Sequence, residues 1–256
     1  MYKKLKIELA TDKIDFRKSS CFQGALFELM DTDYVSILHQ QNRHPYSQYV
    51  YKDKDKVYWT ICTCDDDSSH YMMNPILDDS IQQITLNKEK EPILFVSKQL
   101  KMVSQEQLMD HFYNKPAERY LEIRILTPMS FKSYGRYINY PDLRLIYQSL
   151  MNKYDSVLKE ASMFDEDTLD MLVEGSEIVK YNLRSYLFPL QGVKIPSFFG
   201  TMTIKITSTD TAAKFIRLLL EFGEYSGVGI KTGLGMGAIQ IVRRDNEWQI
   251  MKLKSS

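Results

Sequence analysis

Five of the eleven glycines in this chain fall in one short segment, Gly227-Val-Gly-Ile-Lys-Thr-Gly-Leu-Gly-Met-Gly237. Glycine has no Cβ, so it adopts backbone conformations closed to other residues and lets bulky groups come close. If the segment is extended, its apolar residues share one face, and the glycines share the other with Lys231. We therefore predict a backbone surface with one ammonium group, which suits a bulky anionic polymer. The simpler alternative is a tight turn or bulge that joins a helix to an edge strand.

Two kinds of nucleotide-binding loop contain similar glycines, and the surrounding sequence excludes both. A phosphate loop of the Gly-x4-Gly-Lys-Ser/Thr type needs glycines where this chain has Tyr225 and Ile230. Gly233-x-Gly235-x-x-Ala238 fits the dinucleotide fingerprint loosely, but that fingerprint follows a strand and opens a helix. Here a predicted helix at 211–225 precedes the glycines and a predicted strand at 238–242 follows them, which is the reverse order.

Composition places any polyanion site on a local patch of the surface. Lysine plus arginine equals aspartate plus glutamate at 33 each, so the whole chain is not basic, although a concentrated patch can still bind nucleic acid. The sequence contains no apolar run near the roughly 18 residues of a membrane span. It also opens directly into a strand pattern without a signal peptide. We therefore expect a cytoplasmic protein that does not enter a membrane.

The three cysteines are typical of a reducing compartment and predict no disulfide framework. Cys62-Thr-Cys64 lies in a β-rich stretch, so the two thiols are predicted to point the same way from one strand. A structural zinc site usually spaces its thiols by about two to four residues and needs a second ligand pair. We therefore expect neither a metal nor another cofactor.

Hydrophobic periodicity divides the chain into two similar halves. Each half reads as strand, helix, strand, strand, helix, strand, which is an α+β pattern without regular βαβ alternation. Asn114-Lys-Pro116 marks the linker, so residues 1–116 and 117–256 are predicted to be two domains. The polar runs at 65–69 and 127–140 are predicted to be irregular. The predicted strands are 3–10, 57–64, 81–87, 93–103, 120–126, 178–187, 202–206 and 238–242, and the predicted helices are 22–30, 33–39, 72–78, 105–113, 141–154, 165–174 and 211–225.

Four motifs occur in an order that resembles a known family. They are the glycine segment, Phe22-Gln-Gly-Ala-Leu-Phe27, Leu38-His39 followed by Pro45-Tyr-Ser47, and Leu126-Thr-Pro-Met-Ser-Phe131. Together they resemble the RAMP superfamily and, within it, the CRISPR repeat-processing endoribonucleases. The resemblance implies two tandem ferredoxin-like domains that bind the repeat of precursor CRISPR RNA and cut it once per repeat.

The resemblance also implies a metal-independent reaction. The ribose 2′-hydroxyl attacks the adjacent phosphorus, leaving a 2′,3′-cyclic phosphate and a 5′-hydroxyl, so DNA is not a substrate. The expected partner is therefore precursor CRISPR RNA. Formation of a homodimer and transient hand-over of the processed guide to a CRISPR effector complex are both compatible with the resemblance.

Histidine suits the proton transfers of this reaction because its ordinary pKa lies close to the working pH. His39 carries the Leu-His motif and ranks first, and His44 is its rival as an acid or a phosphate contact. The family pattern adds a tyrosine in the first helix, where this chain has Phe27, so Tyr46, Ser47 or Tyr34 is expected to replace it. Arg43 approximates the family lysine and can stabilise phosphorane charge, although it does not donate a proton near neutral pH.

RNA binding is predicted at two places in the second half. In the loop around residue 134, cations alternate with tyrosines, an arrangement that lets bases stack while the cations meet phosphate. The predicted RNA-binding residues are Lys132 and Arg136 in that loop and Gly227, Gly229, Lys231, Thr232, Gly233 and Gly235 in the glycine segment. Two other functions stay open at this point: a noncatalytic RNA-binding subunit of a CRISPR effector complex, and a nucleotide-binding enzyme outside this family.

Overall fold

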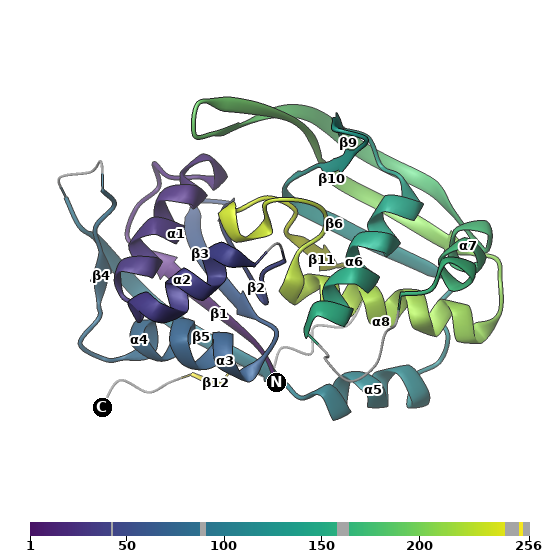
Figure 1. Ribbon diagram of the computed structural model, residues 1–256, viewed down its shortest axis with the longest axis horizontal. Coiled ribbons are helices and arrows are strands. Elements are labelled where there is room, and N and C mark those ends of the chain that lie inside the picture. The colour runs from purple at the N-terminus through teal and green to yellow at the C-terminus, as the bar shows by residue number, and fades with distance from the viewer. Residues whose placement is uncertain (42, 88–90, 158–163, 244–250, 253–256) are drawn as a thin grey trace.

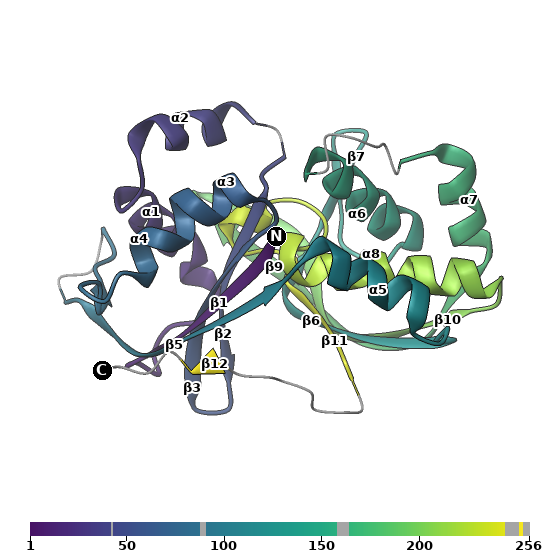
Figure 2. The same cartoon turned by 90° about the horizontal axis from the view of Figure 1, so that it is seen from below.

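Two antiparallel sheets lie side by side in the computed structural model, with helices packed against each (Figure 1). The structure describes residues 1–41, 43–87, 91–157, 164–243 and 251–252. Figure 2 shows α1 to α4 with the first sheet and α6, α7 and α8 with the second, and α8 also contacts strands of the first sheet. The glycine segment, drawn in yellow in Figure 1, runs between the two halves.

The first sheet has β1 (Tyr2–Leu9) at its centre. This strand pairs with β3 (Lys56–Thr63) on one side and with β5 (Ile93–Val103) on the other, and β2 (Tyr46–Asp53) lies beyond β3. The order β5-β1-β3-β2 is that of a ferredoxin-like fold, in which strand, helix, strand, strand, helix and strand follow one another. The short strands β4 (Gln83–Ile84) and β12 (Met251–Lys252) also pair with β5.

Helical segments connect the strands of this first sheet. Between β1 and β2 the chain forms η1 (Phe16–Lys18), α1 (Ser19–Glu28) and α2 (Thr32–Gln40). Between β3 and β5 it forms α3 (Asp66–Ser68), a π-helical turn η2 (Ser69–Met73) and α4 (Asn74–Leu77), and after β5 it forms α5 (Gln105–Asn114).

The second sheet repeats the same topology. Its order, β11-β6-β10-β9, places β6 (Tyr120–Met129) between β10 (Val193–Ile206) and β11 (Ile239–Ile241), with β9 (Ser176–Leu190) at the edge. Its helices are α6 (Leu143–Val157), α7 (Glu166–Glu174) and α8 (Asp210–Ser226). The predicted α+β class with tandem ferredoxin-like units is therefore confirmed in the strand order of both sheets.

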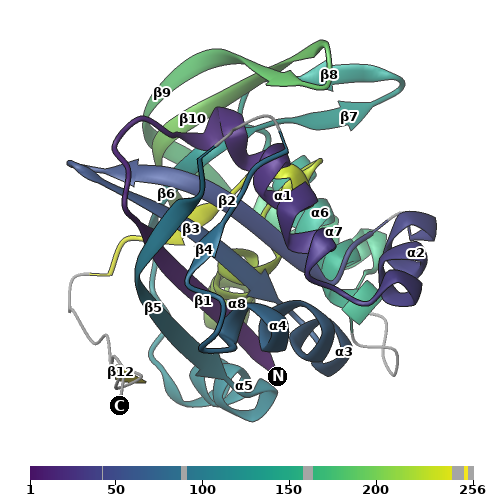
Figure 3. The same cartoon turned by 90° about the vertical axis from the view of Figure 1, so that its left-hand side faces the viewer.

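Two regions predicted to be irregular are instead ordered elements. The carboxylate of Asp65 accepts a hydrogen bond from the Ser68 amide at 2.8 Å, so the acidic run begins a helix because its first residue caps it. In the other region β6 continues to Met129, and the hairpin of β7 (Phe131–Ser133) and β8 (Arg136–Ile138) follows. Figure 3 shows this hairpin beside the ends of β9 and β10.

The two halves pack together through a hydrophobic core cluster. The C-terminal part of α8 is buried against the first sheet, where the ring of Tyr2 meets the edge of Phe222 at a centroid distance of 5.8 Å. The largest core cluster accordingly contains residues from both sides of the linker at Asn114 to Pro116. The division into domains 1–116 and 117–256 stays a prediction, and the core extends across it.

Candidate functional site

The glycine segment is a folded turn, so the prediction of an extended strand with alternating faces is wrong. Its backbone has positive φ angles at Gly227 (65°), Gly229 (80°), Lys231 (57°) and Gly235 (99°). A short 3-10 turn, η3 (Thr232–Leu234), lies in its middle. Left-handed conformations are open mainly to glycine, which explains the glycine content better than an exposed extended surface does.

Most of these glycines contact the protein's own chain. A Cβ on Gly233 would lie 2.9 Å from the Tyr46 hydroxyl, and a Cβ on Gly229 would collide with the carbonyl oxygen of Ser130. Gly227, Thr232, Gly233 and Gly235 are buried, whereas Gly229 is half-buried and Lys231 is exposed. The bare backbone therefore serves close packing, and Lys231 is the member of the predicted RNA-binding set that the turn presents to solvent.

A buried glutamine fixes the turn to the first half of the chain. The amide nitrogen of Gln48 on β2 donates to the carbonyl of Gly233 at 2.9 Å and to that of Ser19 on α1 at 2.9 Å. Its carbonyl oxygen accepts a hydrogen bond from the Trp59 indole at 3.0 Å. Because every polar atom of this amide has its partner set by the fold, the turn is held beside the start of α1 and of β2.

The two predicted histidines lie in one aromatic cluster next to this turn. His39 is exposed in the last turn of α2, and its ring meets the edge of Phe27 at a centroid distance of 5.7 Å. His44 is half-buried just before β2, with its ring 5.4 Å from that of Tyr46. Phe27 and Tyr46 in turn lie 6.2 Å apart, so these two rings join the histidines.

The surroundings of His44 favour its neutral form. Burial lowers the pKa of this imidazole, and the positive charges of His39, Lys231 and Lys153 lower it further. Its Nδ1 atom is buried without a hydrogen-bond partner among the described residues. Arg43 is exposed beside it in the chain. The site thus combines a neutral imidazole with nearby cations, which suits proton abstraction close to a bound phosphate.

Tyr46 and Ser47 lie inside the protein, and their positions argue against direct action on a substrate. The Tyr46 hydroxyl accepts a hydrogen bond from Gln23 at 2.7 Å, and burial raises the pKa of this phenol well above its ordinary value. The Ser47 hydroxyl donates to the Tyr225 carbonyl at 2.5 Å. We correct their predicted roles accordingly, because both hydroxyl groups already have structural partners away from solvent.

The predicted RNA-binding loop is the β7–β8 hairpin, and it begins next to the glycine turn. The Ile230 amide donates to the carbonyl of Ser130, the residue before β7, at 3.0 Å. Lys132 and Arg136 are exposed on the hairpin, and the ammonium of Lys132 lies 6.0 Å from the ring centroid of Tyr137. The structure therefore brings the two predicted RNA-binding regions together.

Comparison with known proteins identifies the family. The family model described as "CRISPR-associated endoribonuclease Cas6" matches residues 123–239. The CRISPR-associated endoribonuclease Cas6 of Streptococcus thermophilus is 38% identical over 224 residues, covering 87% of this chain and 90% of that protein. The chain belongs to the Cas6 family. Cas6 of Mycobacterium tuberculosis is 32% identical over 222 residues, covering 85% of this chain and 69% of the relative. The resemblance inferred from the four motifs is confirmed, and a nucleotide-binding enzyme outside the family is excluded.

Solved Cas6 structures share the fold of this chain. A structure titled as a Cas6 product complex has a TM-score of 0.77 at 19% identity, covering 95% of this chain and 100% of that one. Thermus thermophilus Cas6 has a TM-score of 0.68 at 20% identity, covering 94% and 98%. The paired ferredoxin-like sheets are therefore a Cas6 architecture.

Sequence reasoning missed Lys153, which this Cas6 chain places beside the glycine turn. Lys153 is a half-buried residue on α6, and its Nζ contacts Ser226, Gly227 and Thr232. One helical turn earlier, the Ser149 hydroxyl accepts a hydrogen bond from the Gly229 amide at 2.9 Å. Ser149 and Lys153 lie at positions i and i+4 of a predicted amphipathic helix, and this spacing indicates that they share one face of it. Nothing in the sequence indicates that this face packs against the glycine turn.

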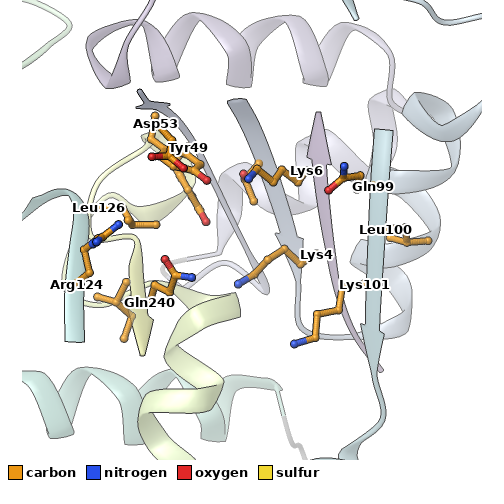
Figure 4. A pocket seen from close by; sticks show the side chains of 13 residues that line it. Lys4, Lys6, Tyr49, Asp53, Gln99, Leu100, Lys101, Arg124, Leu126 and Gln240 are labelled. Atoms are coloured by element: carbon orange, nitrogen blue, oxygen red, sulfur yellow. The ribbon is translucent and has the colours of Figure 1, made fainter. Parts of the chain in front are cut away.

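A second cationic surface lies in a pocket between the two sheets (Figure 4). The pocket has a volume of about 300 Å³ and is lined by Lys4 and Lys6 from β1, Lys101 from β5 and Arg124 from β6. The ammonium of Lys6 lies over the Tyr58 ring at 3.7 Å from its centroid, a cation–π contact. No sequence pattern indicates this pocket, because it forms only where the two sheets converge.

Among the described residues, no group of three or more His, Cys, Asp or Glu side chains is arranged to hold a metal ion. None of the helices described is long and apolar enough to cross a membrane.

Proposed function

We propose that this protein cleaves precursor CRISPR RNA within its repeats to produce guide RNA. The observation that carries the proposal is the placement of His39 and His44 together beside the glycine turn, where Lys231 adds a cation near His44. Membership in the Cas6 family, with relatives that are endoribonucleases, supports the same conclusion.

The proposed reaction is attack of a ribose 2′-hydroxyl on the adjacent phosphorus, without a metal ion. The lowered pKa of His44 suits it to accept the 2′-hydroxyl proton, and the exposed His39 then protonates the departing 5′-oxygen. Arg43 and Lys231 stabilise the negative charge that develops on the phosphorane. The products are a 2′,3′-cyclic phosphate and a 5′-hydroxyl.

RNA binding extends over the surface around these side chains. Lys132, Arg136 and the exposed Tyr134 and Tyr137 of the β7–β8 hairpin offer phosphate contacts and stacking surfaces. The pocket between the sheets, with Lys4 and Lys6, offers a second place for a single-stranded part of the repeat. A product held at these contacts is available for hand-over to an effector complex.

The test uses the repeat RNA of the matching array, a chelator and one modified substrate. We expect cleavage in EDTA and loss of cleavage when a 2′-deoxy nucleotide replaces the one upstream of the cut. His39→Ala and His44→Ala should each slow single-turnover cleavage at least a hundredfold, the scale of general acid–base catalysis, with RNA affinity within a few fold.

A histidine outside the cluster provides the control. His70 is exposed and contacts Asn74 at 3.0 Å, so His70→Ala should cleave like the unmodified protein. Cleavage of the 2′-deoxy substrate would refute the proposed chemistry. Tight RNA binding without any cleavage would instead assign the chain to the noncatalytic subunits of effector complexes.

A further inference from the structure

Lys153 joins the two ends of the turn that carries Lys231. Its Nζ lies 3.2 Å from the Ser226 carbonyl oxygen, 3.0 Å from the Gly227 carbonyl oxygen and 3.2 Å from the Thr232 hydroxyl. In its ammonium form lysine carries three N–H donors, so each of these three acceptors can accept one hydrogen bond from it. Two of them precede Lys231 in the chain and the third follows it directly.

We propose that Lys153 is a positioning residue of the cleavage site, which closes the turn from Ser226 to Thr232 and thereby holds Lys231 beside His44. This inference rests on the proposed function. Ser149 supports the same turn from the same face of α6 by accepting a hydrogen bond from the Gly229 amide. Helix α6 therefore fixes the turn at its beginning, its middle and its end.

The burial of Lys153 agrees with this role. Burial is the main cause that lowers the pKa of its amine to about 7; the Cys64 thiol acts in the opposite direction, and the positive charge of Arg43 acts with burial. A group that loses this much hydration must have its N–H donors satisfied by the protein. The three acceptors of the turn supply those contacts, and no direct contact with a substrate phosphate is needed to explain the residue.

The first experiment compares Lys153→Met with Lys153→Arg at saturating protein. We expect Lys153→Met to slow single-turnover cleavage at least tenfold while RNA affinity stays within threefold. The slope of log affinity against log salt should not change, because a lost phosphate contact would reduce it by about 0.7 to 0.9. Lys153→Arg keeps the charge and the donors, so it should restore at least part of the rate. A changed salt slope or an unchanged rate would overturn the inference.

A second readout does not depend on cleavage. Amide hydrogen exchange in residues 227–237 should be faster in Lys153→Met, because the turn loses its closing contacts. The matched control is Lys214→Met, since Lys214 is also half-buried and donates to a backbone carbonyl, that of Tyr113, at 3.0 Å. That control should leave both exchange in this segment and the cleavage rate unchanged.

Two further comparisons separate the possible failures. If Lys153→Met does not fold, Thr232→Val removes one acceptor at similar shape and should raise exchange in the same segment. Unchanged exchange in residues 227–237 of every variant that folds would overturn the inference, whether or not the protein cuts RNA. Cleavage of a repeat with a 2′-deoxy nucleotide at the cut by the unmodified protein would refute the proposed function. The hydrogen-exchange measurement would still test whether Lys153 holds the turn.

Discussion

The Ser47 hydroxyl on β2 donates a hydrogen bond of 2.5 Å to the carbonyl of Tyr225, in the last turn of α8. Both residues are buried, and they come from different halves of the chain. This contact joins the strand that follows His44 to the helix that leads into the glycine turn. The two parts of the proposed site are thus connected through the protein interior.

Removing this contact should weaken the fold more than the chemistry. Ser47→Ala leaves the Tyr225 carbonyl without its partner, so we expect the free energy of unfolding to fall by about 1 to 3 kcal/mol. Cleavage per folded molecule should stay within a few fold. Urea denaturation measures the first quantity and single-turnover kinetics the second. Ser36→Ala removes an exposed hydroxyl on α2 and should change stability by less than about 0.5 kcal/mol.

The pH dependence of cleavage should respond to Lys231. If His44 is the base, the rate falls as pH drops through its pKa, which burial and neighbouring charges hold below the ordinary value. Lys231→Met removes one of those positive charges, so the pKa rises and the acid limb of the pH–rate profile moves to higher pH. The profile is measured at saturating RNA. Lys132→Met, on the hairpin, should lower affinity without moving this limb, and a limb that does not move in Lys231→Met would contradict the assignment of His44.

Two glycine substitutions should have opposite effects on stability. A Cβ at Gly233 would lie 2.9 Å from the Tyr46 hydroxyl, inside a buried contact, so Gly233→Ala should destabilise the protein by about 1 to 3 kcal/mol. Gly24 lies within α1, and a Cβ there meets no atom within 4 Å. Gly24→Ala should therefore stabilise the protein by about 0.5 to 1 kcal/mol. Thermal unfolding of the two variants checks whether stability falls in the first and rises in the second.

The pocket between the sheets should contribute to RNA affinity through phosphate contacts. Lys4→Gln combined with Lys6→Gln should weaken binding of the repeat and reduce the salt slope by up to about 1.4 to 1.8, the value for two contacts. Lys3 alternates with Lys4 along β1 and faces the other side of the sheet, so Lys3→Gln is the control. An equal effect for each lysine removed, in the double variant and in Lys3→Gln, would show that only general charge matters.

Local pattern predicted part of the elements of this fold, but it missed β2 and residues 193–201 of β10. The alternation in β1 and the apolar face of α8 predicted both elements within two residues of their observed ends, because burial repeats with the period of each structure. The charge of the acidic run at Asp65 is typical of a solvated loop, whereas its capping hydrogen bond starts a helix. The two converging sheets could not be placed relative to each other from periodicity.

The candidate site could likewise be predicted only in part from the sequence. His39 and His44 could be selected because few histidines are present and one carries a family motif. The burial of Tyr46 and Ser47 could not be foreseen, since β2 is covered by α8 and the glycine turn from far along the chain. Lys153 lay outside every motif because its role depends on a tertiary contact between α6 and that turn.

The distance in sequence between the histidines and the glycine turn has a consequence for biosynthesis. During translation the segment with His39 and His44 leaves the ribosome long before residues 226–237, and Gln48 finds its partner Gly233 only when the latter has emerged. Contacts of such long range form late in folding. In a nascent chain the glycine turn is therefore not yet beside His44, and the proposed site is complete only after residues 226–237 have left the ribosome.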